Sequence, residues 1–503
     1  MSEMKQSATE NIEKMERDDL IELVGTLQSR VAELESEVAE QAEKIKSLEA
    51  QLAKDSHNSG KPPSSDGLKK PKKTKSLRSK TGRSVGGQKG HKGHRLEMVE
   101  VPDKTENYHL TDCPDCKNDL SQEAIKRCER RQVYDLPPEI QLEVTEHQAE
   151  IKDCPHCEKE VMANFPEHVT QPTQYGPRFK AQACYLNTYQ MLPVDRTAEL
   201  LEDFYGKRPS NGFILGANAQ VEAKTESSVG AIKEQLTKAD VTHHDESGVR
   251  VAGKTQWLHV SSTENLTHFQ IHEKRGKEAM DAIGILPNAT GIIVHDHWKS
   301  YLSYDNVEHA FCNAHHLREL IFMVEQHQQD WAQEMISLLC EIKESVDEYS
   351  SSHPDAQSLP PNICKAFETQ YDTILQRGFD ANPQPLPDPS QPKKRGRQKQ
   401  TPPKNFLDRL QIHKSGVLAF MSNFSVPFDN NLAERDVRMI KVKQKVSGSF
   451  RSDSGASTFC NLRSYISTVR KRGLNVLSSL SDALFGNPFM PSSSDSAPSI
   501  TSE

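Results

Sequence analysis

Apolar residues recur every seven positions between residues 20 and 52 of the chain. One register consists of Leu20, Leu27, Leu34, Gln41 and Leu48, and the alternate register consists of Val24, Val31, Val38, Ile45 and Leu52. β-Branched residues at position a with leucine at position d favour a parallel two-stranded coiled coil, in which one polar core residue can fix the register. The pattern therefore predicts a self-association helix within residues 12–55. The alternative is a single amphipathic helix that packs against its own chain.

From Val241 onward the period of the apolar positions changes to two, which is typical of strands. The segments VTHHDESGVRV, TQWLHVSST and THFQIHEKRG predict three consecutive strands. A helix in GKEAMDAIGIL follows, and then two further strands in TGIIVHDHW and HAFCNAHH. Three strands, a helix and two strands form the layout of a mixed sheet flanked by helices. The sequence therefore predicts an α/β fold for this part of the chain.

Helical periodicity lies on both sides of the predicted sheet. Before it, TAELLEDFYGKRPSNGFILGANAQVEA places Ala198, Leu201 and Phe204 on one face, breaks at Gly206 and restarts after Ser210. This arrangement is compatible with a helix-turn-helix, although any helical hairpin has the same pattern. After the sheet, helical segments run from about 317 to 349, from 406 to 424 and again from 431, and a proline-rich basic stretch at 381–403 interrupts them.

The charges of the chain are unevenly distributed. The formal net charge is −8, yet residues 61–95 contain 12 Lys or Arg and one acid, Asp66, so this segment carries +11 and the remainder −19. Clustered cations bind phosphate backbones through counterion release, whereas a plain solvated linker needs no such charge. Its composition predicts a disordered basic arm over residues 56–100. We expect nucleic-acid contacts from Lys69, Lys70, Lys72, Lys73, Lys75, Lys89 and Lys92.

Length and hydropathy restrict the class of protein. A chain of 503 residues is too long for one hydrophobic core, so we expect three or four structural units. The sequence contains no run of 18 apolar residues, so we expect no membrane span. The first residues, MSEMKQSATENIEKMERDD, lack the apolar core of a signal peptide. We therefore expect a cytoplasmic protein without a membrane partner. In a reducing compartment its ten cysteines should not form a disulfide framework.

Four of these cysteines form two Cys-Pro-x-Cys pairs. Cys113 and Cys116 belong to CPDC, and Cys154 and Cys157 belong to CPHC. Two such pairs in a cytosolic chain supply the four thiolates of a tetrahedral structural zinc site. The alternating stretch RRQVYDLPPEIQLEVTEHQAEI predicts strands between them. The sequence predicts one Zn²⁺ ion in a module over residues 101–170; redox pairs and unligated cysteines are the alternatives.

Three acids carry the candidate chemistry. Asp245 closes the first predicted strand, Asp296 ends the apolar segment GIIVHD, and Glu434 lies one turn into the helix that follows the turn Asp429-Asn430-Asn431. A pair of Mg²⁺ ions held by such carboxylates can activate the attacking oxygen and stabilise the leaving oxygen of a phosphodiester.

The same acids have simpler interpretations. A strand-end aspartate often caps the next turn, and Glu434 could form a solvated ion pair with Arg438. Glu246, Asp429 and Asp436 are rival ligands, of which Asp429 fits the turn best. In favour of the metal site, Arg438 and Lys441 share a helix face with Glu434 and are placed to contact phosphate.

The segment CNAHHLREL follows the last predicted strand. Cys312 and His315 have the spacing of a metal-binding pair, but only two such ligands are visible, so we expect them to pack around the strand. Arg318 is a candidate for DNA contact. The histidines beside the acids should be local hydrogen-bonding groups, because Mg²⁺ prefers oxygen ligands; they are His243, His244, His295 and His297.

The order of these motifs resembles that of the insertion sequence 66 family of bacterial transposases, the large DDE-type protein of those elements. The resemblance extends almost from end to end. It rests on HNSGKPPSSDG, GGQKGHKGH, the paired Cys-Pro-x-Cys motifs, HHDESGVRV, VHDHWKSY, CNAHHLREL, KKRGRQKQ, VPFDNNLAERDVRMIKVKQKVSGSFRS and RSYISTVRKRGLNVL. One departure is Ser247, where the family often has threonine.

The resemblance implies an RNase H-like catalytic core in which Asp245, Asp296 and Glu434 hold two Mg²⁺ (or Mn²⁺) ions. The core would comprise residues 238–318 and 426–485, with a helical insertion at 319–425. Lys441 matches a basic residue that such enzymes place two helical turns after the acid. The remaining predicted units are a helical DNA-binding region at 171–237 and a disordered tail at 486–503.

The implied activity is metal-dependent cleavage of DNA at the ends of an insertion sequence, followed by strand transfer into target DNA. Its partners would be element-end and target DNA, a second copy of the chain held through the coiled coil, and accessory proteins of the same element, in a bacterial cytoplasm beside the nucleoid. Two alternatives explain part of the sequence. One is a non-catalytic zinc and coiled-coil DNA-binding protein, and the other is a structure-specific nuclease on the same fold.

Overall fold

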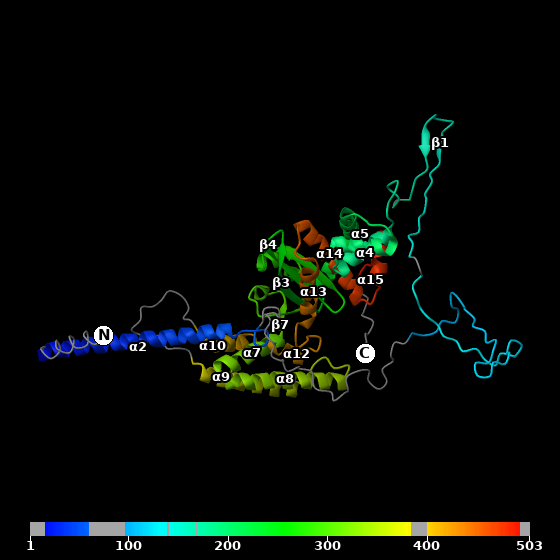
Figure 1. Ribbon diagram of the computed structural model, residues 1–503. Coiled ribbons are helices and arrows are strands. Elements are labelled where there is room, and N and C mark those ends of the chain that lie inside the picture. Colours follow the sequence, from blue (N-terminus) through cyan, green and yellow to red (C-terminus); the bar gives the residue numbers. More distant parts are fainter. Residues whose placement is uncertain (1–15, 60–95, 138–139, 167, 384–399, 493–503) are drawn as a thin grey trace, which may run out of the picture.

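The computed structural model describes residues 16–59, 96–137, 140–166, 168–383 and 400–492 (Figure 1). All seven arm lysines named above lie outside these ranges. Within the described residues, no helix combines the length and the apolar character needed to cross a membrane.

The predicted N-terminal helix is present as α2 (Arg17–Leu52), which extends away from the body of the protein (Figure 1). None of its residues is buried, and the apolar heptad positions face solvent, with Val38 64% exposed. Its C-terminal end is attached to the body. Ala50 packs against the largest core cluster, and the side chain of Asn58, just beyond the helix, donates a hydrogen bond of 3.1 Å to Glu325.

The cysteine-rich region contains little regular structure. A short antiparallel pair, β1 (Ile151–Asp153) and β2 (Glu160–Met162), flanks the second cysteine pair at the end of a long excursion from the body (Figure 1). Of the stretch 130–151 predicted to form strands, only its last residue, Ile151, belongs to a strand, β1, and the other residues that the structure describes there form none. The prediction was wrong because alternation alone supplies no partner strand, and a ladder needs one.

Four helical elements precede the sheet: α3 (Pro177–Cys184), the π-helical turn η2 (Tyr185–Tyr189), α4 (Val194–Tyr205) and α5 (Asn211–Lys238). The predicted break is confirmed. Gly206 ends α4 in the left-handed conformation, and the hydroxyl of Ser210 caps α5 by accepting from the backbone N–H of Phe213. One face of α5 is buried along its whole length, from Ile214 to Leu236.

The predicted mixed sheet is confirmed. Its five strands are β3 (Val241–Val251), β4 (Lys254–Ser262), β5 (Thr267–His272), β6 (Ile292–His295) and β7 (Glu308–Phe311), in the order β5-β4-β3-β6-β7. The first three are antiparallel, and β6 and β7 continue the sheet in parallel with β3. The crossover after β5 contains α6 (Lys277–Ile283) and η3 (Leu286–Asn288), and η4 (Tyr301–Ser303) lies between β6 and β7.

The segment HAFCNAHH forms a strand only in its first part, because β7 ends at Phe311 and a helix begins at Asn313. That helix, α7 (Asn313–His327), opens a helical unit with α8 (Asp330–Ser352), α9 (Pro361–Ala381), α10 (Pro402–Ile412), α11 (Lys414–Val417) and α12 (Ala419–Ser422). Trp331, Tyr371 and Phe406 are buried in its core. The predicted boundary between residues 318 and 319 therefore falls inside a helix, and the unit begins earlier than expected.

Three helices complete the body: α13 (Asn431–Ser447), α14 (Asp453–Lys471) and α15 (Val476–Leu484). α13 packs across β3 and β4, and α14 packs on β5 and α5. The hydroxyls of Ser464 and Thr468 accept hydrogen bonds from the backbone N–H groups of Phe269 and Thr267. These bonds satisfy backbone donors of the edge strand β5, which would otherwise be open to pairing with another strand.

Residues 487–492, expected to belong to a disordered tail, are held against the body. The backbone N–H of Phe489 donates to the hydroxyl of Tyr465, and the side chain of Gln235 donates to the carbonyl of Pro491. Phe489 also packs against the cluster formed by α5, α14 and α15. Two hydrogen bonds and one apolar contact therefore hold this short segment to the body. The rest of the predicted tail lies outside the described residues.

Candidate active site

Two of the three candidate acids meet because of the sheet register. β3 and β6 are parallel neighbours that pair Val241 with Ile292 and His243 with Val294. Asp245 lies in the middle of β3, whereas the sequence predicted that it closes the strand. The same register, continued by two residues, places Asp245 level with Asp296, which directly follows β6. Neighbouring residues on parallel strands lie about 4.8 Å apart and point to the same face. The sheet therefore brings together two aspartates that are far apart in the sequence.

The pKa of Asp245 also indicates that several acids lie close to one another. The pKa of Asp245 is raised well above its ordinary value, first by burial and then by the negative charges of Glu246, Asp296 and Glu434. Like charges gathered in a poorly solvated place raise one another's pKa and favour a bound cation. The donor set is carboxylate oxygen, which suits Mg²⁺ or Mn²⁺.

Glu434 lies in the first turn of α13, and its side chain is 14% exposed. Its Oε2 accepts a long hydrogen bond of 3.4 Å from the exposed guanidinium of Arg438. Its Oε1 is buried and has no hydrogen-bond partner. The predicted solvated ion pair with Arg438 is thus only part of the environment, and the unsatisfied oxygen fits the role of a metal ligand.

Asn430 fixes the start of α13 to the sheet. The sequence places Asn430 in the turn before the helix, and its side chain makes no capping bond to α13. Instead, the ring Nδ1 of His243 donates to Asn430 Oδ1 (2.9 Å), and Asn430 Nδ2 donates to the carbonyl of His244 (2.8 Å). The backbone N–H of Asn430 donates to Cys312 Sγ at 3.2 Å. Sequence reasoning missed this role because the bonds cross between distant segments.

Each rival carboxylate is engaged elsewhere. Glu246 accepts two hydrogen bonds from Arg275 (3.0 and 2.7 Å) and one from Tyr301 (2.6 Å). Asp429 accepts from the backbone and side chain of Asn431, as expected for a turn residue. Asp436 accepts from Lys471 and Thr267. Asp245 and Asp296 each accept one bond as well, from the backbone N–H groups of Glu246 and Trp298 (2.8 Å in both), the second as expected for an aspartate that caps a turn. The other oxygen of each aspartate and Oε1 of Glu434 remain as candidates for metal binding.

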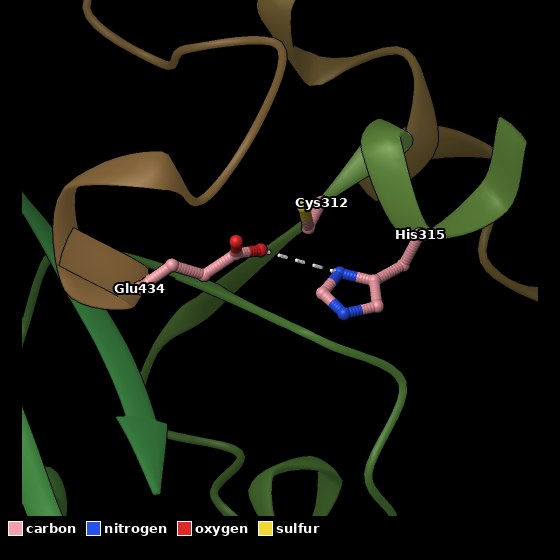
Figure 2. A group of neighbouring side chains, drawn as sticks. All are labelled: Cys312, His315 and Glu434. Atoms are coloured by element: carbon pink, nitrogen blue, oxygen red, sulfur yellow. Dashed lines mark ion pairs between the residues drawn. The ribbon is translucent and has the colours of Figure 1, made fainter. Parts of the chain in front are cut away.

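The sequence predicted that Cys312 and His315 only pack around the strand, because it showed no third metal ligand. In the structure, Glu434 lies beside both residues and supplies a third possible ligand (Figure 2). Cys312 follows β7, His315 lies in the first turn of α7, and the ligand atoms of the three residues all lie within 4.8 Å of one another. In the described part of the chain, no other set of three or more His, Cys, Asp or Glu residues is this tight. Asp245, Asp296 and Glu434 are therefore neighbours but are more widely spread.

The cations proposed for phosphate contact have different environments. Arg438 is 66% exposed. Lys441 Nζ donates to the carbonyl of Gly248 at 2.8 Å, and burial lowers the pKa of Lys441. Arg318 is half-buried on α7, one turn beyond His315. Sequence reasoning did not single out Lys443, which lies over the ring of Phe450 and whose pKa burial lowers to about 8.

Most of the flanking histidines make the expected local contacts. His244 bonds to the hydroxyls of Thr242 and Ser261, and His295 bonds to His309. Burial lowers the pKa of His244 and of His295 to about 3, so both rings are neutral. His297 differs, because both of its ring nitrogens are buried without a hydrogen-bond partner.

The two cysteine pairs each form a tight turn. The backbone N–H of Lys117 donates to the carbonyl of Cys113, and the backbone N–H of Glu158 donates to the carbonyl of Cys154. Both following residues, Lys117 and Glu158, have positive φ. Backbone N–H groups within each turn lower the pKa of Cys113 and of Cys154, which favours thiolates. Each pair fits half of a zinc site, but the structure does not bring the two pairs together as one ligand set.

The fold and the site define the class of this protein: a mixed α/β protein with a long N-terminal helix and a group of carboxylates beside the central strand of its sheet. A model of the transposase IS66 family matches residues 172–458, and the chain belongs to this family. Its members are transposases, so the chain is a transposase and acts on DNA. The resemblance inferred from the sequence motifs is confirmed.

Other comparisons add less. A family of unknown function, DUF6444, matches residues 6–97. No curated protein matches the chain. One solved structure, a cryoEM structure of a simian T-cell lymphotropic virus intasome in complex with PP2A regulatory subunit B56 gamma, is 11% identical over 42% of this chain and 71% of that chain, with a TM-score of 0.14. That similarity is too low to support an inference about function.

Proposed function

We propose that this transposase uses Asp245, Asp296 and Glu434 to hold two Mg²⁺ or Mn²⁺ ions and to cleave and join DNA. One observation carries the proposal: the raised pKa of Asp245, to which Asp296 and Glu434 both contribute, together with the buried, unsatisfied oxygen of Glu434. Three acids from distant parts of the sequence that share one poorly solvated place repel one another, and a bound cation would compensate their charge. When bound, the ions would activate the attacking oxygen and stabilise the leaving oxygen.

The chemistry would proceed in two steps at the same carboxylates. Water would attack a phosphorus atom at the element end, breaking the bond to the 3′ oxygen and leaving a free 3′-hydroxyl and a 5′-phosphate. That hydroxyl would then attack a phosphodiester of target DNA in line, releasing a new 3′-hydroxyl there. Asp245, Asp296 and Glu434 would orient the reacting groups, and Arg438 and Lys441 would contact phosphates. No protein nucleophile is required.

The sheet supports an RNase H-like core as the scaffold. In this sheet of three antiparallel strands followed by two parallel strands, Asp245 lies on the central strand and Asp296 directly follows its parallel neighbour, β6. α13, which carries Glu434 in its first turn, packs on β3 and β4. The proposed zinc module and the lysine arm would position DNA through its phosphates, without reading its sequence.

The exposed heptad face of α2 supports a proposed coiled-coil dimer. A helix with no buried residue and an apolar stripe is stabilised by pairing with a second copy. Val31→Asp in the stripe should convert the protein to monomers in light scattering, while Ser36→Asp on the opposite face of the same helix should not. Equal masses for both variants and wild type would remove the coiled coil as the dimer interface.

The proposed zinc site requires both cysteine pairs to join around one Zn²⁺ ion. Metal analysis of the purified protein should find zinc, and Cys113→Ser should lower its content. Cys340→Ser, on α8, is the matched control. Unchanged zinc in Cys113→Ser would contradict the assignment.

Cleavage assays test the catalytic proposal. Purified protein and labelled element-end DNA should give Mg²⁺-dependent cleavage and joining, both of which Asp245→Asn should abolish. Asp380→Asn, an exposed acid on α9, should retain them. DNA binding without cleavage would favour a non-catalytic DNA-binding protein, and cleavage without joining would favour a nuclease.

A further inference from the structure

Three ligand types meet beside the carboxylate group, each from a different element. Cys312 lies at the end of β7, His315 in the first turn of α7, and Glu434 in the first turn of α13 (Figure 2). The backbone N–H of Asn430 donates to the Cys312 sulfur and fixes the approach of α13 to this point. The cluster is therefore built by tertiary structure and is not a chance feature of one helix.

Two of the three ligands have unsatisfied atoms that face each other. Glu434 Oε1 and His315 Nδ1 are both buried, and neither has a hydrogen-bond partner. They lie 3.8 Å apart, which is too far for a hydrogen bond. The two atoms form a His–carboxylate ion pair at this separation (Figure 2). Buried polar atoms are normally hydrogen-bonded, so both atoms keep an unused capacity to bind a ligand placed between them.

The spacing suits a metal ion. A tetrahedral Zn²⁺ ion with bonds of about 2.0–2.2 Å to nitrogen and oxygen holds those two atoms roughly 3.4 Å apart. The observed 3.8 Å, and the 4.8 Å limit that includes the Cys312 sulfur, need only small side-chain rotations to reach this arrangement.

The ligand chemistry selects the class of metal. Thiolate and imidazole are ligands of Zn²⁺, Co²⁺ and Fe²⁺, whereas Mg²⁺ takes oxygen ligands. Three protein ligands would leave the fourth tetrahedral position open, as in zinc sites that bind an exchangeable group. Binding would displace the proton of the Cys312 thiol.

We propose that Cys312, His315 and Glu434 form a binding site for a transition metal of the Zn²⁺ class, distinct from the paired cysteines of residues 113–157. Its regulatory consequence rests on the proposed function: Glu434 also belongs to the proposed Mg²⁺ site, and one carboxylate cannot serve both sites in full. Zn²⁺ bound at Cys312 and His315 draws Glu434 toward α7 and inhibits Mg²⁺-dependent cleavage.

Cobalt binding tests the site without any activity assay. Full-length protein is stripped of metal and titrated with Co²⁺, whose thiolate charge-transfer and d–d absorption report the ligands. Wild type should bind one equivalent more than Cys312→Ala, while Cys340→Ala, a half-buried cysteine on α8, should match wild type. His315→Asn changes a side chain that is 25% exposed, so it supplies the same test if Cys312→Ala fails to fold. Equal stoichiometry and spectra in wild type and His315→Asn would overturn the site.

The regulatory part has its own readout. Cleavage in Mg²⁺ is measured with increasing Zn²⁺, and the concentration for half inhibition should rise at least tenfold in His315→Asn. Equal inhibition of wild type and His315→Asn would overturn the competition for Glu434. The two proposals can fail separately. If His315→Asn loses the extra Co²⁺ equivalent but the wild-type protein cleaves no DNA, the metal site is supported and the proposed catalytic function is refuted.

Discussion

Asn430→Ala tests whether the start of α13 is held to the sheet by one side chain. Asn430 is 2% exposed, and its amide makes two hydrogen bonds to β3, one with the His243 ring and one with the His244 carbonyl. Removing both leaves two buried polar groups without partners, each costing about 1–3 kcal/mol. We expect the free energy of unfolding to fall by about 2–4 kcal/mol, which corresponds to a Tm lower by roughly 4–8 °C.

The same substitution should affect the chemistry more than the stability. Glu434 lies one turn beyond Asn430, and its backbone N–H donates to the Asn430 carbonyl. A displacement of a reacting group by about 1 Å can reduce a rate by roughly 100-fold. We therefore expect cleavage of element-end DNA to fall by about that factor at a temperature where the variant is folded.

The neighbouring asparagine supplies the matched control. Asn431 is exposed and bonds only to Asp429 of its own turn among the contacts described here. Asn431→Ala should change the free energy of unfolding by no more than about 0.5 kcal/mol. Differential scanning fluorimetry and the cleavage assay measure both effects. Equal Tm values and equal rates for the two variants would refute the anchoring role of Asn430.

Three further changes test other parts of the structure. Gly291→Ala should lower Tm, because a Cβ there would lie 2.4 Å from the carbonyl oxygen of Ala239. Gly230→Ala, in α5, is the control: a Cβ there meets open space, so this variant should have a slightly higher Tm. A Gly291→Ala variant as stable as wild type would contradict the close approach of β6. Asn58→Ala should release the segment after α2 from α7, because Asn58 donates a hydrogen bond to Glu325. Faster hydrogen exchange at residues 53–59 would report the release, and unchanged exchange would mean that other contacts hold this segment. Burial lowers the pKa of His268 to about 4, below an unfolded value of about 6.5, so the unfolded state binds the proton first and stability is lost as pH falls from about 6.5 toward 4. His268→Gln should lose less Tm than wild type between pH 7.5 and 5.0, and an equal loss would argue against a neutral buried ring.

Local patterns determined much of the fold. Heptads predicted α2, the period of two predicted β3, β4 and β5, and Gly206 with Ser210 marked the break between α4 and α5. These features depend on residues close together in the sequence, so they can be inferred without long-range contacts. The same reasoning failed for most of residues 130–151, where alternation had no partner strand before Ile151, and for residues 487–492, whose attachment depends on α5 and α14.

The sequence by itself identified the family and named Asp245, Asp296 and Glu434 as the acids to consider. The register of β3 against β6 and the docking of α13 are what bring these acids into one region. The bond network of Asn430 and the addition of Glu434 to Cys312 and His315 were decided by tertiary structure alone. The physical reason is range: helices and strands follow from neighbouring residues, whereas a site depends on atoms brought within a few ångströms by the packing of the whole chain.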